Sequence, residues 1–412
     1  MKGLLYLQTR IMQVKKIQII LIPAICFLTF TAAAQPGEKR VQYPWGLKNA
    51  YFGLSMGYIN YPFSSAQLEP GFTVQSVSVP HIAPRITLFG YQFNKYLSAQ
   101  ITYMRPVDWV IYKNINGNIT SNSVWMNVGG LTLAGQLPIA KKFSLFAEAG
   151  LGIITRKGFD INYVDVVKSA TFATGLFGGA LKYHLNRKWD LLLSTTWSPA
   201  DAKNKQPATT FYSAGFNYHL KELSKEKVAS NINSGYYFAK HLLQVSYTTN
   251  AFHYGANDLF SKTLPLFWGG AAHLKQGFSV NYQRNIFHAR KVFSLDWGAG
   301  MGYWRSRNNN DKFFTLSVYP VLRFAAFRSP KTDLFFEYTV AGPTYISKTI
   351  IDNEKTGKKF TFYDAMGIGM FTGKKKNFNA GLRIAHFSNG NIFSQNNGVK
   401  VPLTFSVGYV LK

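Results

Sequence analysis

The sequence predicts an all-β fold, a transmembrane antiparallel β-barrel, on three observations. Aromatic residues make up 16% of the 412 residues and glycines number 35, whereas only 16% of the residues are charged, a balance that does not suit a soluble enzyme of this size. No stretch beyond residue 34 reaches the roughly eighteen to twenty apolar residues that a membrane-spanning helix needs. Runs of about ten residues alternate apolar with small or polar side chains instead, which is typical of outer-membrane β-barrels.

Residues 1–34 have the features of a secretory signal peptide. Two lysines precede an apolar run over 17–30, and three alanines follow it as a small-residue cleavage site. The rest of the chain is therefore expected to be exported. The single cysteine, Cys26, lies inside the apolar run, so the mature chain would contain neither a disulfide nor a thiolate metal site.

Residues 35–220 are expected to form the first of two domains. Within 143–155 the odd-numbered side chains from Phe143 to Ile153 are apolar and would face lipid, whereas Glu148 would face the lumen. The alternating runs predict strands over 50–60, 81–92, 96–106, 123–137, 143–155, 170–184, 189–198 and 208–220.

Residues 221–235 contain many charges and little apolar surface, and they predict a periplasmic linker. Residues 236–412 are expected to form the second domain. The alternating runs there predict strands over 238–249, 271–283, 292–304, 312–326, 333–347, 360–371, 377–388 and 400–411.

Each domain thus contains about eight predicted strands, enough to close a small barrel that side chains fill. Long and short connections alternate, as in bacterial barrels with long loops outside and short turns in the periplasm. The preferred architecture is two tandem eight-stranded barrels, and the alternative is one sixteen-stranded barrel with a water-filled lumen. Strand 51–60 distinguishes them, because it would pair with strand 208–220 in the first case and with strand 401–411 in the second.

A histidine and a serine lie near the end of the strand predicted over 377–388. At a period of two residues, His386 and Ser388 share the apolar face with Leu382 and Ile384. Two residues along a strand span roughly 6.5–7 Å, which allows an imidazole to accept the proton of a serine hydroxyl. The pair has the arrangement of a general base beside a nucleophile.

The C-terminal part of the chain resembles a known family. The stretch HFSNGN that begins at His386, the turn Asn396-Asn397-Gly398 and the last alternating strand are similar to those of the lipid A 3-O-deacylase (PagL-like) family. The resemblance covers about the second half of the chain. It implies a Gram-negative outer-membrane β-barrel that hydrolyses an ester-linked acyl chain of lipopolysaccharide.

The orientation of the barrel determines where this pair would act. An even number of strands leaves both barrel ends in the periplasm, so strand 377–388 would run outward. His386 and Ser388 would then face the outer leaflet, at the depth where acyl chains join the headgroup of lipid A. The membrane itself would supply the substrate.

The acid of the expected triad is where the sequence departs from the family. The resemblance implies a glutamate two residues after the glycine of the Asn-x-Gly turn, where this chain has Lys400. An ammonium cannot orient an imidazole or stabilise its cationic form. Asp364 is the candidate replacement, because a turn centred near 375 sets it opposite His386, on the face of Phe362 and Met366.

The resemblance also implies a group that stabilises the oxyanion. Asn389, which follows the serine, is the expected donor, assisted by backbone N–H groups near Gly390 and by the side chain of Asn396. Neither a metal nor another cofactor is expected. A catalytically inactive structural barrel, consistent with Lys400, and a pore through one wide barrel are the alternative functions.

The formal net charge of +28 does not predict a nucleic-acid partner, because the basic residues are spread over turns and loops rather than clustered on one face. Anionic lipopolysaccharide and other outer-membrane lipids are the expected partners. Pairing of two protomers into a homodimer is left open.

Overall fold

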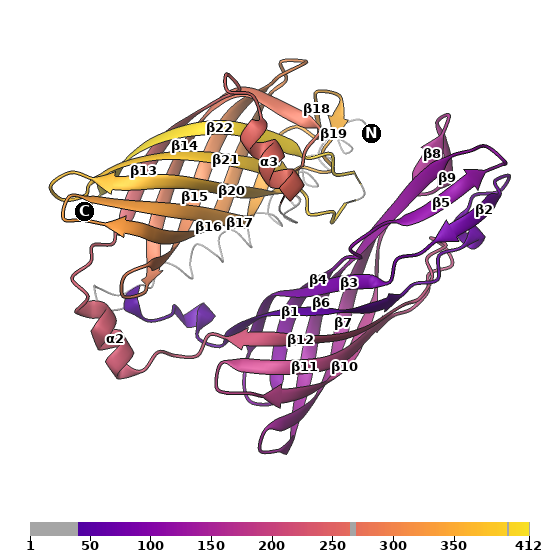
Figure 1. Ribbon diagram of the computed structural model, residues 1–412, viewed down its shortest axis with the longest axis horizontal. Coiled ribbons are helices and arrows are strands. Elements are labelled where there is room, and N and C mark those ends of the chain that lie inside the picture. The colour runs from indigo at the N-terminus through magenta and orange to yellow at the C-terminus, as the bar shows by residue number, and fades with distance from the viewer. Residues whose placement is uncertain (1–39, 264–268, 394, 412) are drawn as a thin grey trace, which may run out of the picture.

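The computed structural model describes residues 40–263, 269–393 and 395–411, and the signal peptide expected over 1–34 lies outside the described residues. Figure 1 shows strands gathered into two barrels, with the long connections toward one side and helix α2 (Lys225–Ile232) with the C-terminus toward the other. Among the described residues, no helix is long and apolar enough to cross a bilayer.

The first barrel is a closed sheet of eight antiparallel strands. The sheet closes because β1 pairs with β12 and β6 pairs with β7, which leaves no unpaired strand edge toward lipid. The strands are β1 (Ala50–Asn60), β3 (Ile82–Gln92), β4 (Leu97–Met104), β6 (Ser121–Ala140), β7 (Phe143–Lys157), β10 (Ala170–His184), β11 (Trp189–Ser198) and β12 (Thr209–His219).

The second barrel repeats this plan with strands of the C-terminal half. It closes through the antiparallel pairing of β13 with β22. The strands are β13 (His241–Thr249), β14 (Ala272–His288), β15 (Phe293–Ser306), β16 (Lys312–Arg328), β17 (Thr332–Ile346), β20 (Phe360–Thr372), β21 (Phe378–Ser388) and β22 (Val399–Leu411).

The closing pairs confirm two tandem eight-stranded barrels and exclude the single sixteen-stranded barrel. Leu54 of β1 lies opposite Phe216 of β12, and Val407 of β22 lies opposite Val245 of β13. The first strand therefore does not pair with the last, and each barrel closes on strands of its own half.

Strand β7 shows how the sequence separates the lipid face from the lumen. Leu145 and Leu151 point outward and are 48% and 44% exposed, whereas Ser144 and Glu148 point inward and are 1% and 5% exposed. This is the alternation predicted for 143–155. Apolar side chains cover the outer wall, and polar side chains enter the lumen.

Hydrogen-bonded side chains fill the middle of the first lumen. The Glu148 carboxylate accepts hydrogen bonds from Gln100 and Thr132, each at 2.7 Å, and pairs with Arg85 at 2.8 Å. Burial of a carboxylate is tolerated when it has such partners.

A second network fills the other lumen. Arg323 and Arg383 both contact Glu337, each at 3.3 Å, and Arg323 also pairs with Asp296. Arg383 in addition donates to Gln244 at 3.0 Å. Side chains thus occupy the space that a water-filled channel would need, so this interior does not favour the pore.

Removal of Arg383 is expected to destabilise the second barrel, because Glu337 would lose one of its two cationic partners in a buried place. The Arg383→Ala variant should lower the free energy of unfolding by about 3–5 kcal/mol, measured by urea titration in lipid vesicles. Arg290→Ala, at an exposed arginine in the short connection between β14 and β15, is the control and should have the stability of the parent. Equal stability of the two variants would contradict a structural role for the network.

Short elements that the sequence did not predict lie in the connections between barrel strands. Helix α2 lies in the segment 221–235, where only a linker was expected, and Ser224 caps it by accepting a hydrogen bond from the Lys227 backbone at 3.3 Å. The others are α3 (Gly255–Thr263), β2 (Val74–Ser78), β5 (Val110–Ile115), β8 (Phe159–Ile161), β9 (Val164–Val167), β18 (Ile350–Ile351), β19 (Glu354–Lys355), η2 (Trp45–Leu47) and η3 (Ser65–Gln67).

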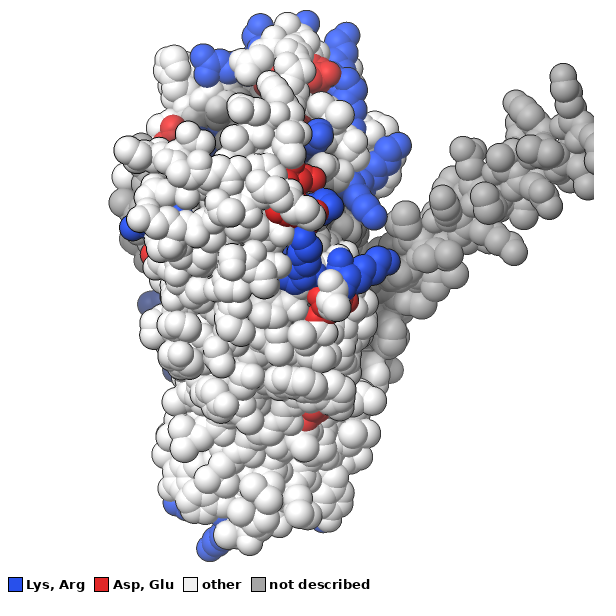
Figure 2. Space-filling view, turned by 90° about the vertical axis from the view of Figure 1, so that its right-hand side faces the viewer, with Lys and Arg blue, Asp and Glu red and all other residues white. Residues whose placement is uncertain are grey.

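Several basic side chains lie on the long connections. Figure 2 shows basic side chains over the upper part of one face, whereas the lower part has few charges. The connection from β17 to β20 contributes four exposed lysines, which are Lys348, Lys355, Lys358 and Lys359. Anionic headgroups are the complementary partners for such a rim.

Candidate active site

The candidate site is a row of three residues across neighbouring strands of the second barrel. His386 on β21 lies opposite Asp364 on β20 and opposite Lys400 on β22. The sequence predicted the pairing of Asp364 with His386 from the position of the turn between their strands, and the register agrees with it. The row lies toward the ends of β20, β21 and β22 that adjoin the long connections (Figure 1).

His386 and Ser388 point away from the lumen, as their shared parity with Leu382 requires. The Nε2 atom of His386 lies 3.1 Å from Oγ of Ser388, within hydrogen-bond distance. Arg383, of the opposite parity, enters the lumen network. The histidine is only 3% exposed, so neighbouring groups cover it although it belongs to the outer wall.

Asp364 approaches the same ring nitrogen as the serine does. Its Oδ2 lies 3.9 Å from Nε2 of His386, whereas Oδ1 accepts a 2.6 Å hydrogen bond from the backbone N–H of Ala341. A bulge in β17 between Thr339 and Gly342 turns this N–H toward the acid, and Ala341 has a φ of +49°. The carboxylate is therefore fixed beside the imidazole, on the side that faces Ser388.

Lys400 points outward because of a second bulge. Ala385 of β21 pairs with Val401, but Arg383 pairs with Thr404, so β22 contains an extra residue between them. Val401 is consequently buried toward the lumen with Ala385, although strict alternation would place it on the same face as Leu403 and Phe405. The Lys400 ammonium pairs with Asp258 of α3 at 2.5 Å, which neutralises its charge beside His386.

Helix α3 lies on the outer wall at the level of His386 (Figure 1). Its Asn257 side chain donates to the carbonyls of Ala385 at 3.2 Å and Val401 at 3.0 Å, at the place where the bulge interrupts the strand ladder. Phe260 packs against Met366 and Ile384. The helix therefore contributes to the cover of the imidazole.

Helix α3 was not predicted, because 250–270 was left as a connection between the strands predicted over 238–249 and 271–283. The available signal was local: Asn257 and Phe260 lie three residues apart and so share one face of a helix, and Asp258 stands in its first turn. Both side chains of that face contact the barrel, which is what a helix lying on the wall requires.

The segment after Ser388 contains the three residues predicted to stabilise an oxyanion. Asn389 is fully buried, and its amide nitrogen donates to the carbonyls of Thr356 at 3.2 Å and Gln395 at 2.7 Å. The Asn389 backbone N–H donates to Oδ1 of Asn396 at 2.8 Å. Both asparagines thus shape the loop, and neither of these two donors is directed at Ser388.

Gly390 is the remaining member of that set. It has a φ of +61°, and Asn391 after it has a φ of +57°, so the chain turns sharply directly after the serine. A Cβ on Gly390 would lie 3.3 Å from the Phe362 ring, which is the cross-strand neighbour of Ser388. The turn therefore holds the Gly390 backbone close to the candidate nucleophile.

The arrangement places an imidazole, a hydroxyl and a fixed carboxylate together at the end of a membrane barrel that adjoins the long connections. These are the groups that acyl transfer to a hydroxyl requires. Among the described residues, no group of three or more His, Cys, Asp or Glu side chains is arranged to bind a metal ion.

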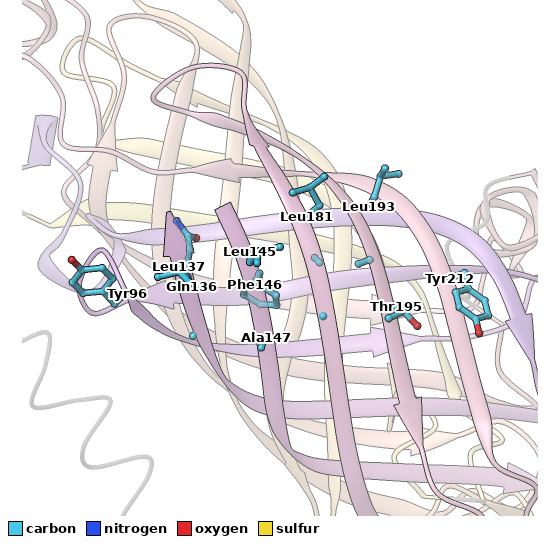
Figure 3. A pocket seen from close by; sticks show the side chains of 14 residues that line it. Tyr96, Gln136, Leu137, Leu145, Phe146, Ala147, Leu181, Leu193, Thr195 and Tyr212 are labelled. Atoms are coloured by element: carbon cyan, nitrogen blue, oxygen red, sulfur yellow. The ribbon is translucent and has the colours of Figure 1, made fainter. Parts of the chain in front are cut away.

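An apolar hollow of about 920 Å³ lies elsewhere, on the outer wall of the first barrel. Leu137, Leu181, Leu193 and Tyr212 are among the side chains around it (Figure 3). These residues point outward like their lipid-facing neighbours, and the hollow contains none of the residues of the candidate site. Its natural neighbours are therefore acyl chains of the bilayer.

Comparison with protein families assigns a separate model to each barrel. Residues 276–409 match the model of lipid A 3-O-deacylase (PagL), and residues 22–219 match the model of the outer membrane protein beta-barrel domain. The resemblance found in the second half of the sequence is confirmed. The protein is located in the outer membrane of a Gram-negative bacterium, as the sequence predicted.

Several solved structures of outer-membrane proteins match about two fifths of the chain. The outer membrane enzyme PagL is 16% identical with a TM-score of 0.32, and the match covers 42% of this chain and 99% of that chain. Neisserial surface protein A is 15% identical with a TM-score of 0.29, over 42% and 97%. The N-terminal barrel of Pseudomonas aeruginosa OprF is 13% identical with a TM-score of 0.28, over 42% and 98%. The search of curated proteins returned no match.

Proposed function

From the match of residues 276–409 to the lipid A 3-O-deacylase family, we propose that the second barrel hydrolyses an ester-linked acyl chain of lipopolysaccharide. The observation that carries the proposal is the 3.1 Å approach of His386 Nε2 to Ser388 Oγ on the outward face of β21. An ester at the headgroup boundary of the outer leaflet would meet these atoms without leaving the membrane. The basic rim of the long connections would attract the anionic headgroup.

The proposed reaction has two steps. His386 Nε2 takes the proton of Ser388, whose oxygen attacks the acyl carbonyl, and the ester C–O bond breaks as that proton passes to the departing sugar oxygen. Water, deprotonated by the same nitrogen, then releases the fatty acid from the serine. The N–H of Gly390, in the sharp turn after Ser388, is the proposed donor to the oxyanion.

Asn389 and Asn396 contribute by holding that turn. The Asn389 side chain donates to the carbonyls of Thr356 and Gln395, and the Asn396 side chain accepts from the Asn389 backbone N–H. Asp364 stabilises the imidazolium that forms during both steps, from 3.9 Å on the serine side. Lys400 has no catalytic part in this scheme, because Asp258 holds its ammonium.

The direct test is incubation of the purified protein with lipopolysaccharide, followed by mass spectrometry of lipid A and of the released acid. Loss of one ester-linked acyl chain with appearance of a free hydroxy fatty acid is the expected result. His386→Gln, prepared in parallel, should release none, since glutamine cannot take the serine proton. Intact lipid A after incubation with the wild-type protein would contradict the proposal.

A barrel without catalytic activity is the second candidate. The geometry of the acid favours this candidate. In a catalytic triad the acid contacts the ring nitrogen opposite the one that contacts the serine, whereas Asp364 and Ser388 both approach Nε2 of His386. The same incubation distinguishes the two candidate functions. If the barrel has no catalytic activity, wild type and His386→Gln should leave lipid A equally intact.

A further inference from the structure

The outer wall of the first barrel carries a buried polar pair where lipid-facing leucines would be expected. Asn127 on β6 and Thr155 on β7 are cross-strand partners with the outward parity of Leu131 and Leu151. The two leucines are 55% and 44% exposed, but Asn127 is 2% and Thr155 is 0% exposed. Polar groups on such a wall are costly unless they have partners.

Thr155 accepts a hydrogen bond from Thr171 of its own barrel at 3.5 Å, and both polar side chains also reach the second barrel. The Asn127 amide donates to the carbonyl of Asn391 at 3.1 Å, and the Thr155 hydroxyl donates to the carbonyl of Ile392 at 3.1 Å. Tyr103 on β4 also forms a hydrogen bond with the Asn391 side chain. The first barrel therefore binds the 389–393 segment, which begins directly after Ser388.

The bound segment is coupled to the turn beside the candidate nucleophile. The Ile392 N–H donates to the Asn389 carbonyl at 3.1 Å, and Oδ1 of Asn391 accepts from Asn396 at 2.7 Å. Gly390 lies inside this set of bonds. A displacement of the two carbonyls that Asn127 and Thr155 hold would therefore move the Gly390 backbone.

The two barrels are also tied at their other ends. Arg40, before the first barrel, donates to the Asn285 side chain at 3.2 Å, and the ring centroids of Tyr43 and Phe287 lie 4.8 Å apart. These contacts belong to the end of β14 that adjoins a short connection. The pair of barrels is thus fixed at two levels, which orients the polar pair toward the 389–393 segment.

We propose that the first barrel is a positioning surface for the active site of the second: Asn127 and Thr155 hold the 389–393 segment so that its backbone faces the substrate carbonyl. This role rests on the hydrolytic function proposed for His386 and Ser388. It assigns the first barrel a part in catalysis without any contact with substrate.

Kinetics with lipopolysaccharide test the positioning role. Thr155→Val should lower kcat about tenfold to a hundredfold, because a small misplacement of reacting groups has effects of this size. KM should change less than about twofold, since the wall does not touch substrate. Thr155→Ser, which keeps the hydroxyl, should restore kcat, and Thr195→Val, at an exposed outward threonine of β11, is the matched control. An unchanged kcat in the Asn127→Ala, Thr155→Val double variant would overturn the proposal.

A cross-link tests the contact independently of activity. Because the exported chain is expected to contain no cysteine, Thr155→Cys and Ile392→Cys should be joined selectively by a short bis-maleimide with a reducible linker, since the Thr155 hydroxyl lies 3.1 Å from the Ile392 carbonyl oxygen. Trypsin cleavage in the lysine-containing segment 221–235 should then leave the two halves joined until reductant is added. Asn60→Cys with Ile392→Cys is the control pair and should separate. Separation of both pairs would overturn the contact.

Hydrogen exchange distinguishes failure of this inference from failure of the hydrolytic function. If wild type does not hydrolyse lipopolysaccharide, amide exchange in 389–393 still reports whether the wall holds the segment. Exchange there should be at least about tenfold faster in Thr155→Val than in Thr195→Val, since loss of the hydroxyl releases one carbonyl. Equal exchange rates in the two variants would overturn the positioning role.

Discussion

Replacement of Ser388 by alanine is expected to abolish the release of fatty acid from lipopolysaccharide, with a loss in kcat of about ten thousandfold or more. The reason is that the Ser388 hydroxyl lies 3.1 Å from His386 Nε2, whereas the residues opposite His386 on the two neighbouring strands, Asp364 and Lys400, carry no hydroxyl. The measurement is the initial rate at which the fatty acid is released, followed by mass spectrometry. The variant must first be shown to fold and insert into the membrane as the wild-type protein does.

Ser76→Ala provides the matched control, because Ser76 is an exposed serine on β2 of the first barrel. Its activity should equal that of wild type. If Ser388→Ala retained wild-type release while His386→Gln lost it, the histidine would activate water directly, and the covalent step would be discarded.

Replacement of Asp364 by asparagine is expected to lower kcat at least about a hundredfold, because the carboxylate is the only acid in the row and a neutral amide cannot stabilise the imidazolium. Asparagine keeps the size and the acceptor for the Ala341 N–H, so the bulge in β17 should persist. The measurement is kcat together with the free energy of unfolding, which should stay within about 1 kcal/mol of the wild-type value.

Lys400→Ala is the counterpart on the other side of His386. It breaks the pair with Asp258, whose side chain is 43% exposed, and such partly exposed pairs contribute about 1 kcal/mol or less to stability. Release by this variant should remain within about threefold of wild type, since the lysine has no part in the proposed steps. A large loss in Lys400→Ala with full activity in Asp364→Asn would reverse the assignment of the acid.

The barrel strands were predictable because one face of each meets lipid and the other meets a filled lumen. Strand β7 begins at Phe143 as predicted, and β10 and β11 occupy the predicted 170–184 and 189–198. The connections were not predictable in the same way. The spacing of Asn257 and Phe260 was a local signal for helix α3. The contacts of these side chains with strands more than a hundred residues later in the chain hold the helix on the wall, and a local pattern cannot show them.

The site was predictable as far as strand parity and register decide it. The outward direction of His386 and Ser388 and the pairing of Asp364 followed from a period of two and one tight turn. The extra residue between Val401 and Thr404 was not visible, because a bulge keeps the same amino acids and changes only their direction. The ring nitrogen that Asp364 approaches depends on side-chain geometry, which no periodicity contains.

Each barrel closes on strands of its own half, so the two barrels can form independently of each other in the membrane. Since β12 completes the hydrogen bonding of the first barrel, the N-terminal half does not wait for any strand of the C-terminal half. The wall around Thr155 can therefore be complete whether or not β21 and the turn after it have inserted. The first barrel would then be ready to bind the 389–393 segment as the second barrel forms. The proposed esterase activity would therefore require that both barrels of one molecule have inserted.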